Sequence, residues 1–287
     1  MEIQIMRDQI EARLQTLLDN CQEPSLKEAM SYSVSAGGKR LRPLLLLGAC
    51  EAVSGQFSQN AVDFACALEM IHTYSLIHDD LPAMDNDDMR RGKPTSHKQF
   101  GEAMAILAGD ALLNRAFETM IHACVDDPKL INAMRVIAVA SGDSGMIAGQ
   151  VIDMHFQHKK ADGDALFNIH SLKTGALFAA AFEAGALIGE GDDSYVQSMK
   201  DVGVKIGRAF QILDDLLDVT ATQETLGKPT GSDSRNEKNT YVSIHGLEAA
   251  KSDYNKISIE ALATLDQLPQ KTLTLRTIVQ QVIDRTY

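Results

Sequence analysis

Apolar residues recur three and four positions apart along most of the chain, which is the spacing of helices that bury one face. Ala, Leu, Met, Ile and Glu, which favour helices, dominate these stretches. Period-two alternation with β-branched residues is nearly absent, so the sequence predicts no sheet. It predicts an all-α protein, with helices over residues 1–20, 44–55, 60–80, 102–125, 129–157, 164–188 and 193–220.

Glycine and proline punctuate these helical runs, as at Gly37-Gly38, Gly55 and Pro128. No low-complexity linker divides the chain, so residues 1–287 are expected to form a single domain. We expect one large bundle of roughly ten or more helices around a central active-site cavity. The polar tracts 86–101 and 222–240 are predicted to be loops over one end of it.

Composition narrows the class of protein. The chain has 287 residues, 45% of them hydrophobic, which is enough for a large core. Its net charge of −12 argues against nucleic-acid binding. It does not exclude binding of small anions, which depends on local clusters of Lys and Arg. No uncharged apolar stretch approaches the ~18 residues of a membrane span. The cysteines form no C-x-x-C pair and are expected to be reduced, in a cytoplasmic protein.

Two aspartate clusters each follow an apolar run. The first begins at Asp79-Asp80 and continues through Asp85, with Pro82 inside it, so the helix before it should end or distort there. The second contains Asp214 and Asp218, which are neighbours on one helix face. Crowded carboxylates repel unless a cation lies among them, and Mg²⁺ prefers such oxygen ligands. One cluster alone is more often a solvated acidic face, but the pair predicts a metal site.

Cationic residues accompany both clusters. Gly37-Gly38 precedes Lys39, Arg40 and Arg42, and glycines let backbone N–H groups approach an anion. Each group alone is compatible with a basic rim or charge balancing. Together they indicate one scheme, in which carboxylates hold a metal and cations hold the anion bound to that metal; the further members are Arg90, Arg91, Lys173, Lys228 and Lys238.

In this order, the motifs resemble those of the trans-isoprenyl diphosphate synthases, most closely the bacterial-type farnesyl diphosphate synthases. The four residues between Asp80 and Asp85 resemble the bacterial and plant geranylgeranyl branch. The resemblance covers nearly the whole chain and rests on GGKRLRP (37–43), IHTYSLIHDDLPAMDNDDMRRGKPTSH (71–97), FGEAMAILAGDALL (100–113), GQVIDM (149–154), LKTGAL (172–177), FQILDDLLD (210–218), TLGKPTGSD (225–233) and KNTYV (238–242).

The resemblance implies an isoprenoid synthase fold, usually a homodimer, with three Mg²⁺ ions. It implies head-to-tail condensation of an allylic diphosphate with isopentenyl diphosphate and release of diphosphate. Metal binding is implied for Asp79, Asp85 and Asp214, with Asp80 and Asp218 close by. The allylic diphosphate would be held by Arg90, Lys173 and Lys238, with Lys228 nearby. Isopentenyl diphosphate would be held by Gly38, Lys39, Arg42, His72 and Arg91. Thr174 and Gln211 would face the reacting carbons, and Gln150 and Asp153 would support the site.

Product length should depend on what blocks the apolar pocket. Tyr74 and Ser75 lie about one helical turn before Asp79, and Tyr74 is bulky enough to be a floor. From spacing alone, Tyr74 is equally compatible with a floor of the pocket and with an ordinary half-buried tyrosine. The family resemblance favours the floor and therefore the C15 product, farnesyl diphosphate.

Other functions remain to be weighed. Geranyl or geranylgeranyl diphosphate synthesis would use the same motifs with another stopping point. A terpene cyclase normally carries an Asn-Ser/Thr-Glu metal motif, and a non-catalytic partner subunit typically loses aspartates that this chain keeps. A helical scaffold with acidic patches would tolerate loss of Asp79 or Asp214. His78 and His97 are expected in the core or a loop, and Arg285 stays unassigned.

Overall fold

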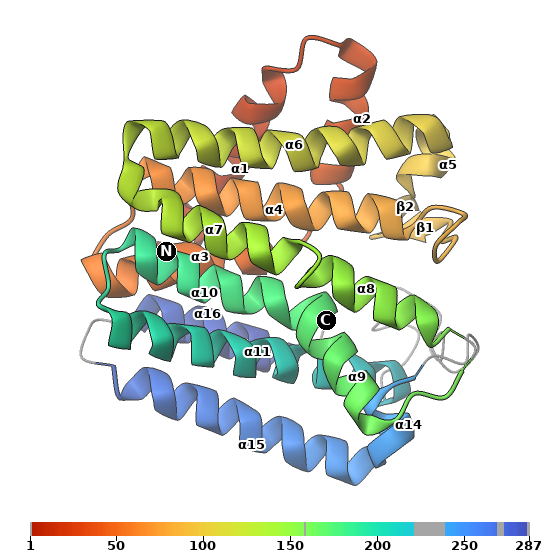
Figure 1. The fold of residues 1–287 in the computed structure, drawn as a ribbon, viewed down its shortest axis with the longest axis vertical. Coiled ribbons are helices and arrows are strands. Elements are labelled where there is room, and N and C mark those ends of the chain that lie inside the picture. The colour runs from red at the N-terminus through yellow and green to blue at the C-terminus, as the bar shows by residue number, and fades with distance from the viewer. Residues whose placement is uncertain (1, 158, 221–238, 269–272, 286–287) are drawn as a thin grey trace.

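The computed structural model describes residues 2–157, 159–220, 239–268 and 273–285 (Figure 1). The N-terminal half contains α1 (Glu2–Asp19), α2 (Pro24–Val34), α3 (Leu41–Ser54), α4 (Gln59–Asp79), β1 (Met89–Arg90), β2 (Lys93–Pro94), α5 (Ser96–Phe100), α6 (Glu102–Asp126), η1 (Pro128–Leu130) and α7 (Ile131–Ser141). The rest contains α8 (Met146–His155), α9 (Gly163–Ile169), η2 (His170–Gly175), α10 (Ala176–Ile188), α11 (Asp193–Thr220), α14 (Tyr241–His245), α15 (Leu247–Asp266) and α16 (Leu273–Ile283).

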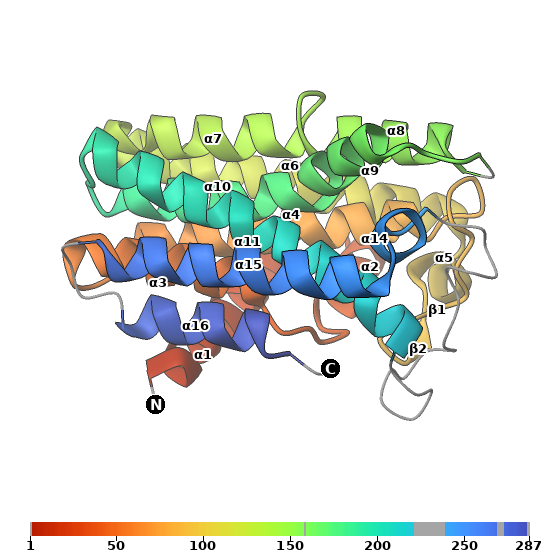
Figure 2. The ribbon, with the colours of Figure 1, turned by 90° about the horizontal axis from the view of Figure 1, so that it is seen from below.

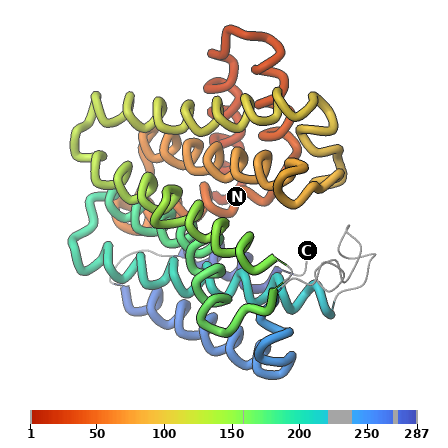
Figure 3. The backbone as a smooth tube through the Cα atoms, turned by 45° about the vertical axis from the view of Figure 1, so that its right-hand side comes forward, coloured from red at the N-terminus to blue at the C-terminus, as the bar shows by residue number. Residues whose placement is uncertain are grey.

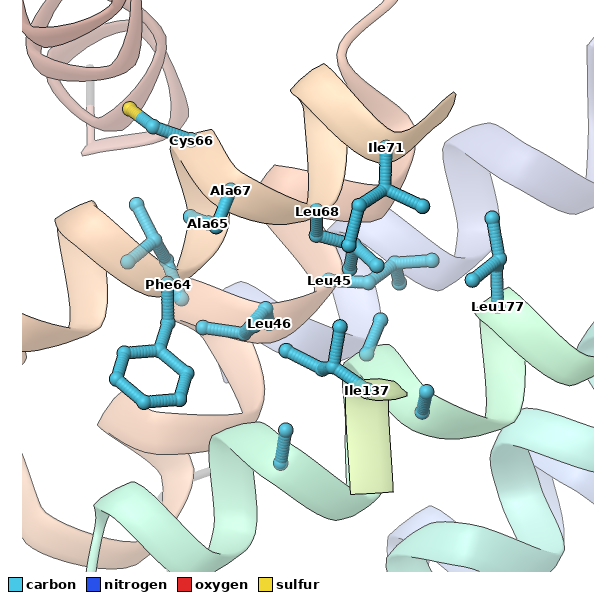
Figure 4. Close-up of a cluster of buried hydrophobic side chains, with 14 of the residues drawn as sticks. Leu45, Leu46, Phe64, Ala65, Cys66, Ala67, Leu68, Ile71, Ile137 and Leu177 are labelled. Carbon is cyan, nitrogen blue, oxygen red and sulfur yellow. The ribbon is translucent and has the colours of Figure 1, made fainter. Parts of the chain in front are cut away.

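The core is centred on α3, α4 and α10, which are apolar on nearly every face and are therefore enclosed by other helices. Figure 4 shows Leu45 and Leu46 of α3 among side chains of α4, with Ile137 of α7 nearby. Both leucines are fully buried. Burying a side chain of this size stabilises the fold by about 1.5–3 kcal/mol.

The helices stack in layers, with α6 against α4, α10 against both α3 and α11, and α15 outside α11 (Figures 1 and 2). The C-terminal ends of α4 and α11 lie at the same end of the bundle, near the β1–β2 hairpin and α14 (Figure 2). Figure 3 shows the connection between α1 and α2 protruding beyond α6. Because α4 and α11 end on the same side, the two aspartate clusters lie at one end of the bundle.

The all-α prediction is confirmed, with local differences. The predicted helix over 129–157 is interrupted between Ser141 and Met146, where Gly142 and Gly145 remove the helical preference. The run 164–188 is helical throughout but contains the π-helical segment η2. The sequence pattern did not predict α2, α5, α14, α15 or α16.

One small hairpin lies in the predicted loop 86–101. Among the described residues, β1 and β2 are the only strands, and they pair antiparallel through two residues each. Arg91 and Gly92 connect them with positive φ angles of 54° and 76°, which is the backbone that a tight hairpin turn requires. The prediction of no sheet was therefore wrong at this point, because so short a hairpin has no alternating pattern.

Of the described residues, one stretch, Gly163–Ile188, is long and apolar enough to cross a membrane. Half of its most apolar window is buried inside the bundle, and it includes Lys173 and Glu183. These features are those of a core helix, which passes the same test of length and composition.

Candidate active site

The first aspartate cluster forms where α4 ends. Pro82 cannot continue the helix, and the chain turns so that the backbone N–H of Asp85 donates to the carbonyl of Asp79 at 2.9 Å. This turn folds Asp85 back toward Asp79. Two carboxylates separated by six positions in the sequence are thereby held at one helix end.

Asp79 lies at the meeting point of three elements. Its Oδ1 accepts a hydrogen bond from Nε2 of Gln150 in α8 at 2.7 Å. Lys173 of η2 places its Nζ 3.9 Å from Asp79 Oδ2 and 2.7 Å from Asp153 Oδ2. The predicted supporting residues Gln150 and Asp153 therefore contact the predicted metal ligand and the predicted phosphate ligand directly.

Gly149 allows this convergence. A Cβ built at Gly149 would overlap the backbone nitrogen of Lys173 and lie 2.6 Å from its Cα. Only a glycine permits α8 to approach η2 so closely. The contact sets the position of Gln150 relative to Lys173.

Asp80 faces away from this group and pairs with Arg90 of the hairpin. The Arg90 guanidinium reaches both carboxylate oxygens, with contacts of 2.6–2.8 Å. Burial raises the pKa of Asp80, and the Arg90 charge partly offsets that effect. Asp80 is 2% exposed, so Asp79 and Asp85 are the carboxylates of this cluster that open more toward ligands.

The second cluster lies on the last turns of α11. Asp214 is exposed, and its Oδ1 accepts from Arg285 at 2.8 Å. The Arg285 guanidinium also lies 3.6 Å from the centre of the Phe210 ring, within cation–π range. Asp218 is half-buried one turn further along. From the sequence, the resemblance left open whether Arg285 helps to close the site, and no role was assigned to it.

Asp215, between these two aspartates, points inward. It is 4% exposed and accepts from Gln211 Nε2 at 3.1 Å and from the backbone N–H of Tyr241 at 2.6 Å. Gln211 Oε1 in turn accepts from the Thr174 hydroxyl at 2.9 Å. Adjacent helical positions point about 100° apart. This geometry explains why Asp215 is buried while Asp214 is exposed. The sequence analysis gave Asp215 no role, although helix periodicity could have distinguished it from Asp214.

The predicted isopentenyl diphosphate residues gather beside this site. Gly37 and Gly38 have positive φ angles of 91° and 139°, and the Arg91 guanidinium packs against Gly38 and donates to the Gly37 carbonyl. The guanidinium of Arg42 lies 4.7 Å from the centre of the Phe178 ring, and its buried Nε has no hydrogen-bond partner. A buried donor of this kind is suited to an anionic ligand.

Lys39, Arg42, His72 and Arg91 form a cationic cluster, and their charges affect one another. Burial, with a smaller effect of Arg91 and Arg285, lowers the pKa of Arg42 to about 10. Burial and the charges of Arg42 and Arg91 hold the pKa of His72 well below its usual value, so His72 is neutral. Partial desolvation of the Lys39 ammonium, together with the Arg285 charge, lowers the pKa of Lys39.

Arg40 belongs to the fold instead. Its side chain is 1% exposed and pairs with Glu69 and Glu11 at 2.7 Å each. It also donates to the Val34 carbonyl at 2.6 Å. The middle cation of the GGKRLRP segment thus ties α1, α2 and α4 to the start of α3, between Lys39 and Arg42.

The remaining predicted residues are placed as follows. Tyr74 is buried in α4, with its ring 5.7 Å from that of His78, and Ser75 donates to the His72 carbonyl. His78 is half-buried in the last turn of α4, 3.1 Å from the Ile106 carbonyl of α6, and His97 is buried in α5. Lys228 and Lys238 lie outside the described residues.

The donor set fits Mg²⁺. Among the described residues, no three Asp, Glu, His or Cys side chains form a group that could hold a metal alone. Mg²⁺ is usually held by one or two carboxylates together with substrate phosphates and water, so a complete protein cage is not required. Asp79, Asp85, Asp214 and Asp218 supply hard oxygen atoms at the ends of α4 and α11, beside the cationic cluster.

Comparisons with known proteins test the family. The polyprenyl synthetase model matches residues 23–281. The chain is 45% identical over 260 residues to farnesyl diphosphate synthase of Micrococcus luteus, covering 91% of this chain and 89% of that one. It is 47% identical over 251 residues to chloroplastic geranylgeranyl pyrophosphate synthase 11 of Arabidopsis thaliana, covering 85% and 70%. The solved geranylgeranyl pyrophosphate synthetase from Pyrococcus horikoshii aligns with a TM-score of 0.90 at 32% identity, covering 99% and 97%.

These matches confirm the family that the motifs indicate. Both farnesyl and geranylgeranyl names occur among the relatives, so they agree on the chemistry and not on the product length. The two aspartate clusters and the cationic residues from Lys39 to Arg91 lie within the matched region, and α1 lies before it. The chain therefore belongs to the polyprenyl synthetase family and is a short-chain trans-prenyltransferase.

Proposed function

We propose that this enzyme condenses dimethylallyl or geranyl diphosphate with isopentenyl diphosphate, head to tail and with Mg²⁺, and stops at C15 farnesyl diphosphate. The observation that carries the proposal is the junction at Lys173-Thr174. Lys173 reaches Asp79 and Asp153, and Thr174 reaches Gln211 of the second aspartate helix. One helical segment thus connects both aspartate clusters at the place where the allylic C–O bond would break.

The leaving group would be held by exchange of charged partners. In the structure, Arg90 pairs with Asp80, and Lys173 pairs with Asp153. We infer that the allylic diphosphate attracts Lys173 and Arg90, while Asp79, Asp85, Asp214 and Asp218 hold the metal, with three ions expected. Bound Mg²⁺ would neutralise the charge that develops on the leaving diphosphate. The cations contribute the same stabilisation from fixed positions.

Isopentenyl diphosphate would bind at the cationic cluster. Arg42, Arg91 and Lys39 supply positive charge, and the neutral ring of His72 offers a hydrogen bond without adding charge. The Phe178 and Phe210 rings lie 4.8 Å apart beside Arg42 and Arg285, which places an apolar wall next to the cations. Such a wall helps to exclude water, which would otherwise convert the allylic cation into an alcohol.

Product length is proposed to depend on Tyr74. Its ring is 6% exposed and lies on α4 between the core and Asp79, so it occupies space that a growing chain would need. Ser75 is the small neighbour. A C20 product is the second candidate, since relatives named geranylgeranyl pyrophosphate synthase are equally similar to this chain. Homodimer formation and a cytoplasmic location stay predictions.

The test is a product assay. Purified protein with Mg²⁺, isopentenyl diphosphate and dimethylallyl diphosphate should give mainly the C15 alcohol after dephosphorylation. Asp214→Ala should reduce turnover by about 100-fold or more without unfolding, because it removes a charged group from the reacting centre. Asp201→Ala, on an exposed part of the same helix, is the control. Absence of condensation by the folded wild-type protein would refute the proposal, and a C20 product would refute its length.

A further inference from the structure

The carboxylate of Asp215 connects two regions of the site. Its Oδ1 accepts from Gln211, and its Oδ2 accepts from the backbone N–H of Tyr241, the first residue of α14. His170 Nε2 lies 3.6 Å from Oδ2, which is longer than a hydrogen bond. Burial lowers the pKa of His170 to about 4, so this imidazole is neutral.

The directions of these hydrogen bonds are determined by chemistry. A carboxylate accepts only, so the Gln211 amide must turn its NH₂ group toward Asp215. The carbonyl oxygen of that amide then faces Thr174. The Thr174 hydroxyl has a single hydrogen, which it must donate to Gln211, and its oxygen lone pairs point elsewhere.

We propose that Asp215 is a positioning residue for the condensation, orienting the Gln211 amide so that Thr174 presents its oxygen lone pairs to the allylic cation. The inference rests on the proposed function. Thr174 is half-buried, follows Lys173 in η2 and donates its hydroxyl hydrogen to Gln211; under the proposed function this hydroxyl faces the allylic carbons. An oxygen dipole turned toward a developing cation stabilises it, whereas a hydroxyl hydrogen in that direction would oppose it.

Asp215→Asn reverses this order and keeps the number of hydrogen bonds. The Tyr241 N–H begins a helix and has no partner within it, so the oxygen of the new amide must stay on Tyr241. The NH₂ group of the new amide then faces Gln211, and the amide of Gln211 has to turn its oxygen toward it. The NH₂ group of Gln211 now donates to Thr174, which frees the Thr174 hydrogen to point into the site.

The kinetic test uses three variants. Asp215→Asn should lower kcat about 10- to 100-fold, the effect of removing one preorganised dipole, with KM changed by less than about twofold. Adding Gln211→Glu should restore at least about tenfold of that loss, because a carboxylate there accepts both from the new amide at position 215 and from Thr174. Asp253→Asn is the matched control, since Asp253 accepts from the hydroxyl of Tyr241 and lies outside the relay.

A second readout does not need turnover. In protein labelled with ¹⁵N at glutamine, the Gln211 side-chain resonance, identified by its loss in Gln211→Glu, should exchange slowly and shift in Asp215→Asn. A kcat within twofold of wild type in Asp215→Asn, or an unshifted Gln211 resonance, would overturn the inference. Loss of kcat that the double variant does not recover would also overturn it. Failure of the proposed function is distinguishable, because wild-type protein would then show no condensation.

Discussion

Gly149→Ala tests whether the close approach of α8 to η2 sets the geometry of catalysis. The added Cβ would overlap the backbone nitrogen of Lys173 and lie 2.6 Å from its Cα, whereas ordinary contacts begin at 3.4 Å. The two backbones must therefore separate by at least about 0.8 Å. Because both neighbours are backbone atoms, no side-chain rotation relieves the overlap.

This displacement acts on two contacts at once. Gln150 follows the substituted position and holds Asp79 at 2.7 Å, and Lys173 holds Asp153 at 2.7 Å. A misplacement of about 1 Å can cost a factor of 100 in rate. We expect kcat to fall about 10- to 100-fold, with a cost to unfolding stability of about 1–3 kcal/mol for overpacking.

The assay is steady-state condensation with labelled isopentenyl diphosphate, together with urea unfolding. Gly163→Ala is the matched control, since its Cβ would meet only His245 at an ordinary 3.6 Å. The control should keep wild-type kcat and stability. A folded Gly149→Ala enzyme with wild-type kcat would show that the α8–η2 contact does not position the catalytic groups.

Three further predictions address the floor, the fold and pH. Tyr74→Ala should shift the product from C15 to longer chains, and Tyr74→Phe should not; an unchanged product profile in the alanine variant would contradict the floor. Glu69→Gln should lower the unfolding free energy by about 3 kcal/mol in urea, since it removes a partner of the buried Arg40; a loss below about 1 kcal/mol would refute this. The pKa of His170 is lowered from 6.5 to about 4, so the stability linked to its neutral ring is complete above pH 6.5 and is lost as pH falls toward 4. That loss is about 3 kcal/mol, and His170→Gln should be spared it in unfolding measured at pH 7 and pH 4; equal pH dependence in both proteins would refute this prediction.

Sequence pattern predicted the helices best where one strong apolar run decided the outcome. The run 60–80 agrees with α4 to within one residue at either end, and 102–125 agrees similarly with α6. The helix α15 escaped prediction because Ser, Asn and Lys interrupt its apolar positions, and its packing against α11 compensates. Tertiary contacts of this kind are not visible in local sequence.

The candidate site was predicted in its composition more than in its pairing. As the motifs predicted, Gln150 contacts Asp79, and Arg42 and Arg91 lie near His72. The pairing of Asp80 with Arg90 depends on the hairpin turn, and the inward direction of Asp215 depends on where α14 begins. Both features arise from contacts between distant segments, which residue spacing does not specify. The π-helical register that directs Lys173 and Thr174 has no compositional mark at all.

The ion pairs that Lys173, Arg90 and Arg285 make with aspartates affect how metal and substrate would bind together. Metal alone would have to compete with Lys173 for Asp79 and with Arg285 for Asp214. Diphosphate alone would have to draw Lys173 away from Asp153 and Arg90 away from Asp80. When both bind, the diphosphate attracts Lys173, and the Asp79 carboxylate that Lys173 leaves is free to bind the metal. Mg²⁺ and the allylic diphosphate should therefore bind with positive thermodynamic coupling, each raising the affinity for the other by the same factor.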